Sequence, residues 1–157
     1  MNLETSSRVT AALLVIGDEI LSGRTKDKNI GFIAEYLTAI GIELREVRVV
    51  PDDEFAIIEG INALRGRNDY LFTTGGIGPT HDDITADCVA KALNVSIDHD
   101  PRAVALLRER YPDPKDLNES RLRMARIPAG ADLINPISKA PGFMVANVIV
   151  MAGVPSI

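Results

Sequence analysis

Apolar and polar residues alternate with two different periods along the first fifty residues of the chain. Residues 11–17 form a continuous apolar run, which is typical of a parallel strand covered on both faces. Residues 28–40 repeat apolar side chains at the helical spacing of three and four residues, and Gly41 follows as the expected C-cap glycine. Residues 42–50 alternate as a strand does, with one slip of the frame. The pattern therefore predicts a strand, a helix and a second strand.

The alternation of predicted strands and helices continues to residue 93. Pro51 opens a helix whose N-cap is Asp52 or Asp53, and residues 70–74 predict a third buried strand. Residues 86–93 again show helical spacing. Such alternation implies right-handed crossovers and a mainly parallel sheet between helix layers. We therefore expect an α/β fold with three layers, in the order α/β/α.

The second half of the chain departs from this regular alternation. Residues 103–111 and 115–126 predict two helices, separated by a proline-rich break at 111–114. A tight reversal at Ala146–Asn147 would join the last two strands as a small antiparallel pair, although the strongest hairpin dipeptides are absent. Three strands are expected here, at 132–135, 143–146 and 148–151.

The domain limits follow from these elements. Residues 1–9 are expected to form a flexible tail, and residues 10–157 a single domain. The Pro155–Ser156 pair is a helix-opening signal, yet no helix follows it. We therefore expect the chain to be part of a longer protein, with the last helix of the domain missing.

Composition narrows the class of protein. A hydrophobic content of 46% and a charged content of 25% are ordinary for a soluble globular domain. The net charge of −5 argues against nucleic-acid and anionic-membrane partners, and an aromatic content of 4% without Trp argues against base-stacking platforms. The lone cysteine, Cys88, lies in an apolar helical pattern and is expected in the core. No apolar run is long enough for a membrane span or signal peptide, so we expect a cytoplasmic protein.

Residues 74–85, with the sequence TGGIGPTHDDIT, carry the strongest chemical signal. They combine a glycine-rich turn, two carboxylates and the start of a helix, directly after a predicted strand. A strand, glycine turn and helix in this order bind anions, because free backbone N–H groups and the helix dipole point at the turn. Neither the dinucleotide-binding fingerprint nor the P-loop is present, since His81 replaces the third glycine and no G-x-x-x-x-G-K-[ST] run exists.

The adjacent carboxylates of Asp82 and Asp83 change this interpretation. Each would repel an anion on the turn by on the order of 3 kcal/mol at about 5 Å and an effective dielectric of about 20. A divalent cation would offset the repulsion, with Mg²⁺ favoured and Mn²⁺ or Co²⁺ as alternatives. The simpler alternative is that both aspartates are helix N-caps. Four cations flank the turn on neighbouring loops: Arg24, Lys26, Lys28 and Lys139.

Further acids follow the other predicted strands. Asp18 and Glu19 follow the first strand, and Asp52 follows the second. Because ligands bind beyond the carboxyl ends of parallel strands, we expect these acids to meet Asp82 and Asp83 in one crevice. The alternatives are solvated loop positions for Asp18 and Glu19 and an N-cap for Asp52. Ser22, Thr80 and Lys139 are further candidate ligand contacts, and the neighbouring His81 is expected to be a polar loop residue rather than a base.

Three segments resemble the molybdopterin-binding domain family of MoaB and MogA, and in particular its CinA-type branch. They are residues 17–25 (GDEILSGRT), 49–53 (VVPDD) and 74–85, and Asn135–Pro136 with 140–143 (APGF) adds to them. The resemblance covers roughly residues 10–157. It implies a three-layer α/β domain with a small extra sheet region.

The resemblance also implies a site. In the molybdenum-cofactor members, the glycine turn and the following Asp serve the pterin phosphate and Mg²⁺-dependent adenylylation, which assigns a phosphate cradle to Gly75, Gly76 and Gly78 and the metal to Asp83. Asp52 would be a second ligand-facing acid. CinA-type domains are also similar to ADP-ribose pyrophosphatases, and the related domain of eukaryotic FAD synthase to an FAD hydrolase. Relatives are commonly dimers or trimers, which implies a homo-oligomer.

Two residues that depart from the family pattern decide the order of the functional hypotheses. Ile77 and Asp82 stand where pterin-adenylylating members usually have Thr and Arg, and the additional carboxylate favours metal-assisted hydrolysis. The first hypothesis is a nucleotide diphosphate hydrolase, with the metal on Asp82 and Asp83, and Glu19 or Asp18 serving a second metal or the water. The second is a pterin-binding or adenylylating protein. The third is a non-catalytic ligand-binding domain whose acids only cap helices.

Overall fold

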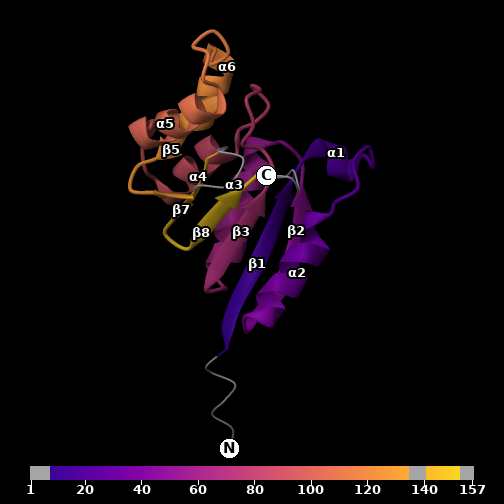
Figure 1. Ribbon diagram of the computed structural model, residues 1–157. Helices are drawn as coiled ribbons and strands as arrows, with labels where there is room; N and C mark the ends of the chain where they lie inside the picture. The colour runs from indigo at the N-terminus through magenta and orange to yellow at the C-terminus, as the bar shows by residue number, and fades with distance from the viewer. Residues whose placement is uncertain (1–7, 135–140, 153–157) are drawn as a thin grey trace, which may run out of the picture.

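The computed structural model of the chain describes residues 8–134 and 141–152. These residues form one six-stranded sheet, one two-stranded sheet and the helices that cover them (Figure 1). The elements in chain order are β1 (Val9–Ile16), α1 (Asp18–Leu21), α2 (Asn29–Ala39), β2 (Ile42–Val50), α3 (Glu54–Arg65), β3 (Tyr70–Thr74), α4 (Thr85–Leu93), β4 (Ile97–His99), α5 (Pro101–Arg110), α6 (Glu119–Leu122), the 3-10 helix η2 (Arg123–Ala125), β5 (Arg126–Pro128), β6 (Asp132–Ile134), β7 (Gly142–Val145) and β8 (Val148–Met151).

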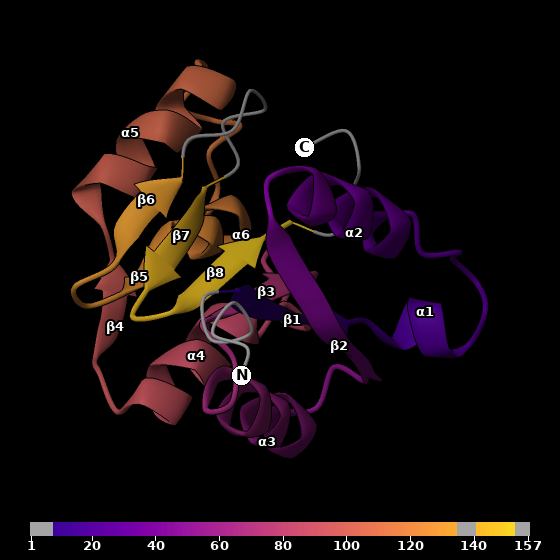
Figure 2. The ribbon, with the colours of Figure 1, turned by 90° about the horizontal axis from the view of Figure 1, so that it is seen from below.

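The large sheet has the strand order β2-β1-β3-β8-β7-β6. Its first four strands are parallel, and β7 runs antiparallel to both β8 and β6. Helix α2 covers one face of the parallel part, and α3 and α4 cover the other (Figure 2). The predicted α/β fold with three layers, a mainly parallel sheet and an antiparallel pair is therefore confirmed.

Strand β1 occupies the centre of the parallel part, between β2 and β3. Its apolar run is fully buried from Ala11 to Leu14 because helices lie on both faces of the sheet. The slip in the alternation of β2 has a structural cause, since the pairing with β1 shifts register between Ala11 and Ala12 and passes over Arg45. At the far end Val15 pairs with Thr74, so the loops after β1 and β3 leave the sheet side by side.

The helix ends follow the predicted capping chemistry in most places. Gly41 has a φ of +86° just beyond α2, as expected for a C-cap glycine. The carboxylate of Asp53 accepts a hydrogen bond of 2.9 Å from the N–H of Ala56 and caps α3. Ala146, with a φ of +51°, and Asn147 form the predicted reversal between β7 and β8.

The predicted helix at 115–126 is wrong. The Asn118 side chain accepts a hydrogen bond from the N–H of Arg121, so the helix starts only at residue 119 and gives way to η2 and then β5. Strand β5 pairs antiparallel with β4, a pair that the sequence did not reveal. Strands of three residues contain too few positions for alternation to be visible.

The first strand begins near the start of the described chain, and Cys88 lies inside the domain. Val9 already pairs with Ile42, so the domain begins before residue 10, while residues 1–7 and 153–157 lie outside the described residues. Cys88 is buried in the core as predicted, and burial together with the nearby Glu54 charge raises the pKa of its thiol to about 12. In the described part of the chain no helix has the length and apolar character needed to cross a membrane.

Candidate functional site

The site lies where the parallel strands end. The N–H of Gly17, directly after β1, donates to the carbonyl of Val50 at the end of β2. The N–H of Gly75, directly after β3, donates to the carbonyl of Met151 in β8. These backbone hydrogen bonds, of 3.0 and 3.3 Å, hold the two loops against the edge of the sheet.

Backbone geometry explains why the first two residues of the turn are glycines. Gly75 and Gly76 have φ values of +96° and +74°, which residues with a side chain rarely adopt. A Cβ on Gly75 would lie 2.1 Å from the carbonyl oxygen of Ile16, and one on Gly76 would lie 2.1 Å from Oγ1 of Thr85. Thr85 is fully buried and donates from its hydroxyl to the carbonyl of Gly75 and from its N–H to that of Gly76, both at 3.0 Å.

The turn presents backbone donors that no described residue of the chain uses. Within residues 8–134 and 141–152 the N–H groups of Gly76, Ile77 and Gly78 have no hydrogen-bond acceptor. Pro79 follows them and carries no N–H. Successive amides without an acceptor among the described residues are a backbone arrangement that can bind an anion.

A closed turn of four residues fixes the carboxylate of Asp83. Its Oδ2 accepts hydrogen bonds from the N–H of Thr80 at 2.9 Å and from the hydroxyl of Thr80 at 2.8 Å. In return the N–H of Asp83 donates to the carbonyl of Thr80 at 3.1 Å. Helix α4 starts later, with Ile84 as an N-cap that makes no side-chain bond. The alternative that Asp82 and Asp83 are the N-caps of this helix is therefore wrong.

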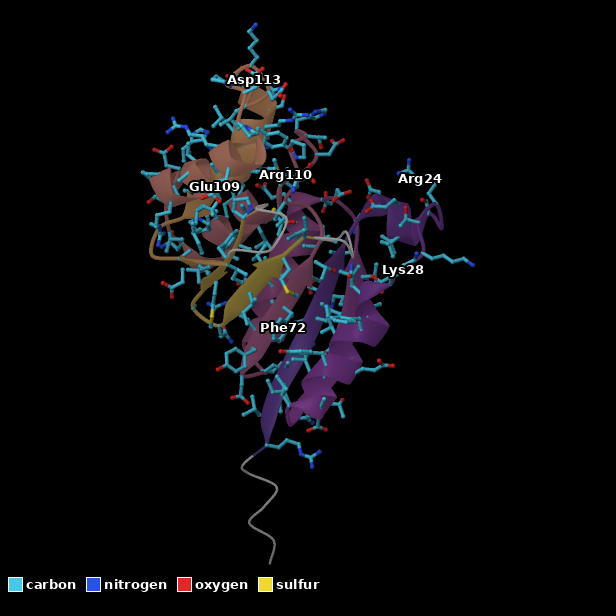
Figure 3. All side chains as sticks on the ribbon, viewed as in Figure 1. Arg24, Lys28, Phe72, Glu109, Arg110 and Asp113 are labelled. Carbon is cyan, nitrogen blue, oxygen red and sulfur yellow. The ribbon has the colours of Figure 1, made fainter. Side chains whose placement is uncertain are left out.

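A cavity of about 620 Å³ lies beside the glycine turn. It is bounded by the turn, by α1, by the loop that precedes α2 and by the end of α5. Its charged lining residues are balanced: Lys26, Lys28 and Arg110 against Glu19, Asp27 and Asp83. Figure 3 shows Arg24 and Lys28 on the side of α1 and Arg110 on the opposite side.

Five of the predicted site residues line this cavity, namely Glu19, Gly75, Gly76, Gly78 and Asp83, and Lys26 and Lys28 join them among the predicted cations. The others do not line it: Asp18, Ser22, Arg24, Asp52, Thr80 and Asp82. Lys139 lies outside the described residues. The predicted convergence of five carboxylates is thus reduced to two, Glu19 and Asp83.

Both converging carboxylates lie against a glycine. A Cβ on Gly17 would lie 2.6 Å from Oε1 of Glu19, and a Cβ on Gly78 would lie 2.9 Å from Oδ2 of Asp83. Neither glycine has a φ in the left-handed region, so the backbone conformation at these two positions does not require glycine. Gly17 and Gly78 therefore make room for the two acids of the cavity.

Asp18 and Asp52 use their carboxylates to join two loops. The N–H of Asp18 donates to Oδ2 of Asp52 at 3.1 Å, and the N–H of Asp52 donates to Oδ1 of Asp18 at 3.0 Å. Burial raises the pKa of Asp52 above its ordinary value of 3.8, although the bond from Asp18 opposes this. The charges of Asp18, Glu19 and Asp83 raise the pKa further, which marks this edge of the sheet as a region of crowded negative charge.

Asp52→Asn is expected to raise the melting temperature at pH 7. The amide oxygen still accepts the bond from Asp18, while the unfavourable charge is removed. Because the pKa of Asp52 is raised by folding, its ionised form destabilises the fold, and this penalty disappears as the pH falls through the raised pKa toward 3.8. Thermal melts between pH 4 and 7 should therefore show a gap that narrows at low pH. Asp53→Asn is the control, because Asn caps a helix about as well as Asp; an equal gain there would contradict this explanation.

Asp82 is turned away from the cavity. Its side chain is 76% exposed and lies 3.5 Å from Nε2 of His81, which is itself 91% exposed. Among the described residues no group of three or more His, Cys, Asp or Glu side chains is arranged to hold a metal ion by itself. The pairing of Asp82 with Asp83 as metal ligands stays a prediction, and the cavity lining favours Glu19 as the partner of Asp83.

The sequence interpretation missed several lining residues, including Asp27, Asn29, Tyr111 and Met124. Asp27 accepts a hydrogen bond of 2.7 Å from the N–H of Ile30 and so fixes the start of α2 beside the cavity. The spacing from Asp27 to Ile30 was the signal available for it. Met124 lies in the segment that was expected to be a regular helix, so its position could not be predicted.

A family model described as "Probable molybdopterin binding domain" matches residues 12–157. A protein of Pyrobaculum arsenaticum is 36% identical over 151 residues, which cover 92% of this chain and 57% of that protein. A CinA-like protein of Desulfosudis oleivorans is 39% identical over 151 residues, covering 92% and 37% of the two chains. This chain thus spans less than two thirds of the length of these relatives.

Solved structures agree with this relationship. The crystal structure of the protein CinA, of unknown function, from Thermoplasma acidophilum matches with a TM-score of 0.86 and 36% identity, covering 96% of this chain and 92% of that one. The molybdopterin biosynthesis enzyme MoaB from Thermus thermophilus matches with a TM-score of 0.59 and 18% identity, covering 94% and 83%. The second match concerns the fold alone.

Proposed function

We propose a function from the family of this chain, which belongs to the molybdopterin-binding domains and to their CinA-like branch. The proposal is that the cavity binds a phosphorylated nucleotide or pterin together with a divalent cation. We further propose that it hydrolyses a diphosphate bond of the kind found in ADP-ribose and FAD.

One observation supports phosphate binding above all others. The N–H groups of Gly76, Ile77 and Gly78 have no acceptor among the described residues, and all three residues line the cavity. The positive side chains of Lys26 and Lys28 line the same cavity and would offset part of the ligand charge. Free amides with nearby cations are the arrangement that binds phosphate.

The lining acids fit a cation that is shared with the ligand. Oδ2 of Asp83 is engaged by Thr80, and no described residue donates to Oδ1. Glu19 supplies a second carboxylate to the cavity. Mg²⁺ typically binds through one or two carboxylates plus substrate phosphates, so Asp83 and Glu19 would hold it only when the ligand is present. When bound, the cation would supply charge neutralisation and polarise a phosphorus–oxygen bond.

The residues of the chain would divide the reaction between them. The amides of Gly76 to Gly78 hold the phosphate oxygens and orient the diphosphate. One oxygen of the Glu19 carboxylate would help to hold the cation, and the other would accept a proton from a water molecule. The oxygen of that water would form a bond to one phosphorus atom as the bridging P–O bond breaks. The bridging oxygen leaves with the second phosphate, so ADP-ribose and water would yield AMP and ribose 5-phosphate. No redox partner is required.

Pterin binding is the second candidate, and the family model favours it. Asp82 does not line the cavity, so its additional carboxylate gives hydrolysis less support than the sequence suggested. The same amides could hold the phosphate of a pterin, so binding alone does not separate the two functions.

Product analysis separates them. The 157-residue chain is incubated with ADP-ribose, FAD and molybdopterin in the presence of Mg²⁺, Mn²⁺ or Co²⁺, and AMP is measured by chromatography. We expect AMP from ADP-ribose or FAD only when a metal is present, and none after EDTA is added. Tight molybdopterin binding without AMP release would favour the second candidate, and the absence of any binding would reject both.

A further inference from the structure

Arg123 is a half-buried cation beside the glycine turn, at the start of η2. Its Nη2 donates to the backbone carbonyl of Asp83 at 3.5 Å. A second, small cavity of about 20 Å³, enough for one water molecule, is lined by Arg123 together with turn residues 76–78 and Asp83. Arg123 does not line the large cavity. Its charge therefore lies near the turn, outside the space that a ligand would fill.

The charge of Arg123 is not neutralised by any described residue of the chain. Arg123 forms no ion pair with these residues, and its Nε is buried without a hydrogen-bond acceptor. Arg126 lines the same small cavity, but its Nη2 lies 2.7 Å from Oδ1 of Asp87. Asp87 belongs to the first turn of α4, the helix that follows the glycine turn. Both arginines thus reach this segment, and Arg126 alone is paired there with a carboxylate.

An unpaired cation that is partly removed from water lowers the stability of a fold. A negative charge nearby offsets this cost. The described residues offer the guanidinium of Arg123 the carbonyl of Asp83, which carries no net charge. A phosphate on the amides of Gly76, Ile77 and Gly78 would supply the missing negative charge. Because part of the guanidinium is buried, solvent and salt screen the attraction less than they would at the surface.

We infer that Arg123 is a positioning residue of the phosphate site, whose charge acts through the glycine turn and attracts the anion from the side of the small cavity. This inference rests on the proposed function, since it places a phosphate on residues 76–78. It assigns part of the anion affinity to a residue that does not touch the ligand. Loss of one partly screened charge is expected to weaken the binding of a phosphate dianion about 10-fold.

Calorimetric titration of variants of the 157-residue chain with AMP in the presence of Mg²⁺ tests the inference. Arg123→Gln should lower the AMP affinity about 10-fold, whereas Arg123→Lys keeps the charge and should retain the affinity within about threefold. Arg48→Gln is the matched control. Arg48 is an arginine of β2 whose side chain is 28% exposed, and it lines neither cavity, so its replacement should change the affinity less than about twofold.

The outcomes distinguish this inference from the proposed function. Unchanged AMP affinity in Arg123→Gln would overturn the role of Arg123 while phosphate binding stands, and so would equal losses in the Gln and Lys variants. Failure of the natural sequence to bind AMP would overturn both. If Arg123→Gln does not fold, the Nε–H signal of Arg123 in the unmodified protein decides the matter. It should shift as AMP is added while the Arg48 signal stays unchanged, and no shift at saturating AMP overturns the inference.

Discussion

Asp83→Asn is expected to lower kcat/KM for metal-dependent AMP release on the order of 100-fold. The amide oxygen of Asn can still accept the two hydrogen bonds from Thr80, so the turn at 80–83 should keep its shape. The negative charge that would hold the cation is lost. The measurement is the rate of AMP release from ADP-ribose over a range of Mg²⁺ concentrations, with a thermal melt to show that the fold is retained.

Asp82→Asn is the matched control for this prediction. The two aspartates are adjacent, but Asp82 is 76% exposed and does not line the cavity. We therefore expect less than about a twofold change from its replacement, as for a surface substitution away from the site. Equal losses in the two variants would contradict the assignment of Asp83 as the acid that serves the cation, and so would full activity of Asp83→Asn.

Gly75→Ala and Gly76→Ala are each expected to destabilise the fold by about 3–5 kcal/mol. Each new Cβ would lie 2.1 Å from an oxygen atom, of Ile16 in one case and Thr85 in the other, and each residue would have to keep a positive φ or rearrange the turn. This loss is a large part of the total stability of a domain of this size. Urea unfolding followed by circular dichroism measures it.

Gly130→Ala separates the clash from the backbone strain. Gly130 has a φ of +83°, but a Cβ there would meet no atom within 4 Å. Its replacement should therefore cost only about 1 kcal/mol. If the three alanine variants are equally stable, the tight contacts of the glycine turn with β1 and α4 are not a determinant of the fold.

The parallel core could be predicted from the sequence because its signals are periodic and local. The continuous apolar run of β1, the helical spacing of α2 and the capping residue Asp53 each identify an element without knowledge of the rest. The same reasoning failed at 115–126, where a side-chain cap and pairing with β4 replaced a regular helix. Tertiary contacts overrode local propensity there.

The candidate site could be predicted only in part, for a related reason. Strand order placed the acids at one edge of the sheet, but it did not reveal the direction of each carboxylate. Asp18 and Asp52 use theirs on each other's backbone N–H groups, and Asp82 turns to solvent while its neighbour Asp83 does not. Which of two adjacent aspartates faces the ligand depends on the turn that contains them.

Amide chemical shifts test the central claim most directly, namely that the glycine turn binds phosphate. The assigned ¹⁵N spectrum of the 157-residue chain is recorded during titration with AMP and Mg²⁺. We expect saturable shifts at the N–H groups of Gly76, Ile77 and Gly78, because these amides gain acceptors, and no change at the control amides of Gly41 and Gly130. Shifts that spare the turn at saturating AMP would contradict the claim.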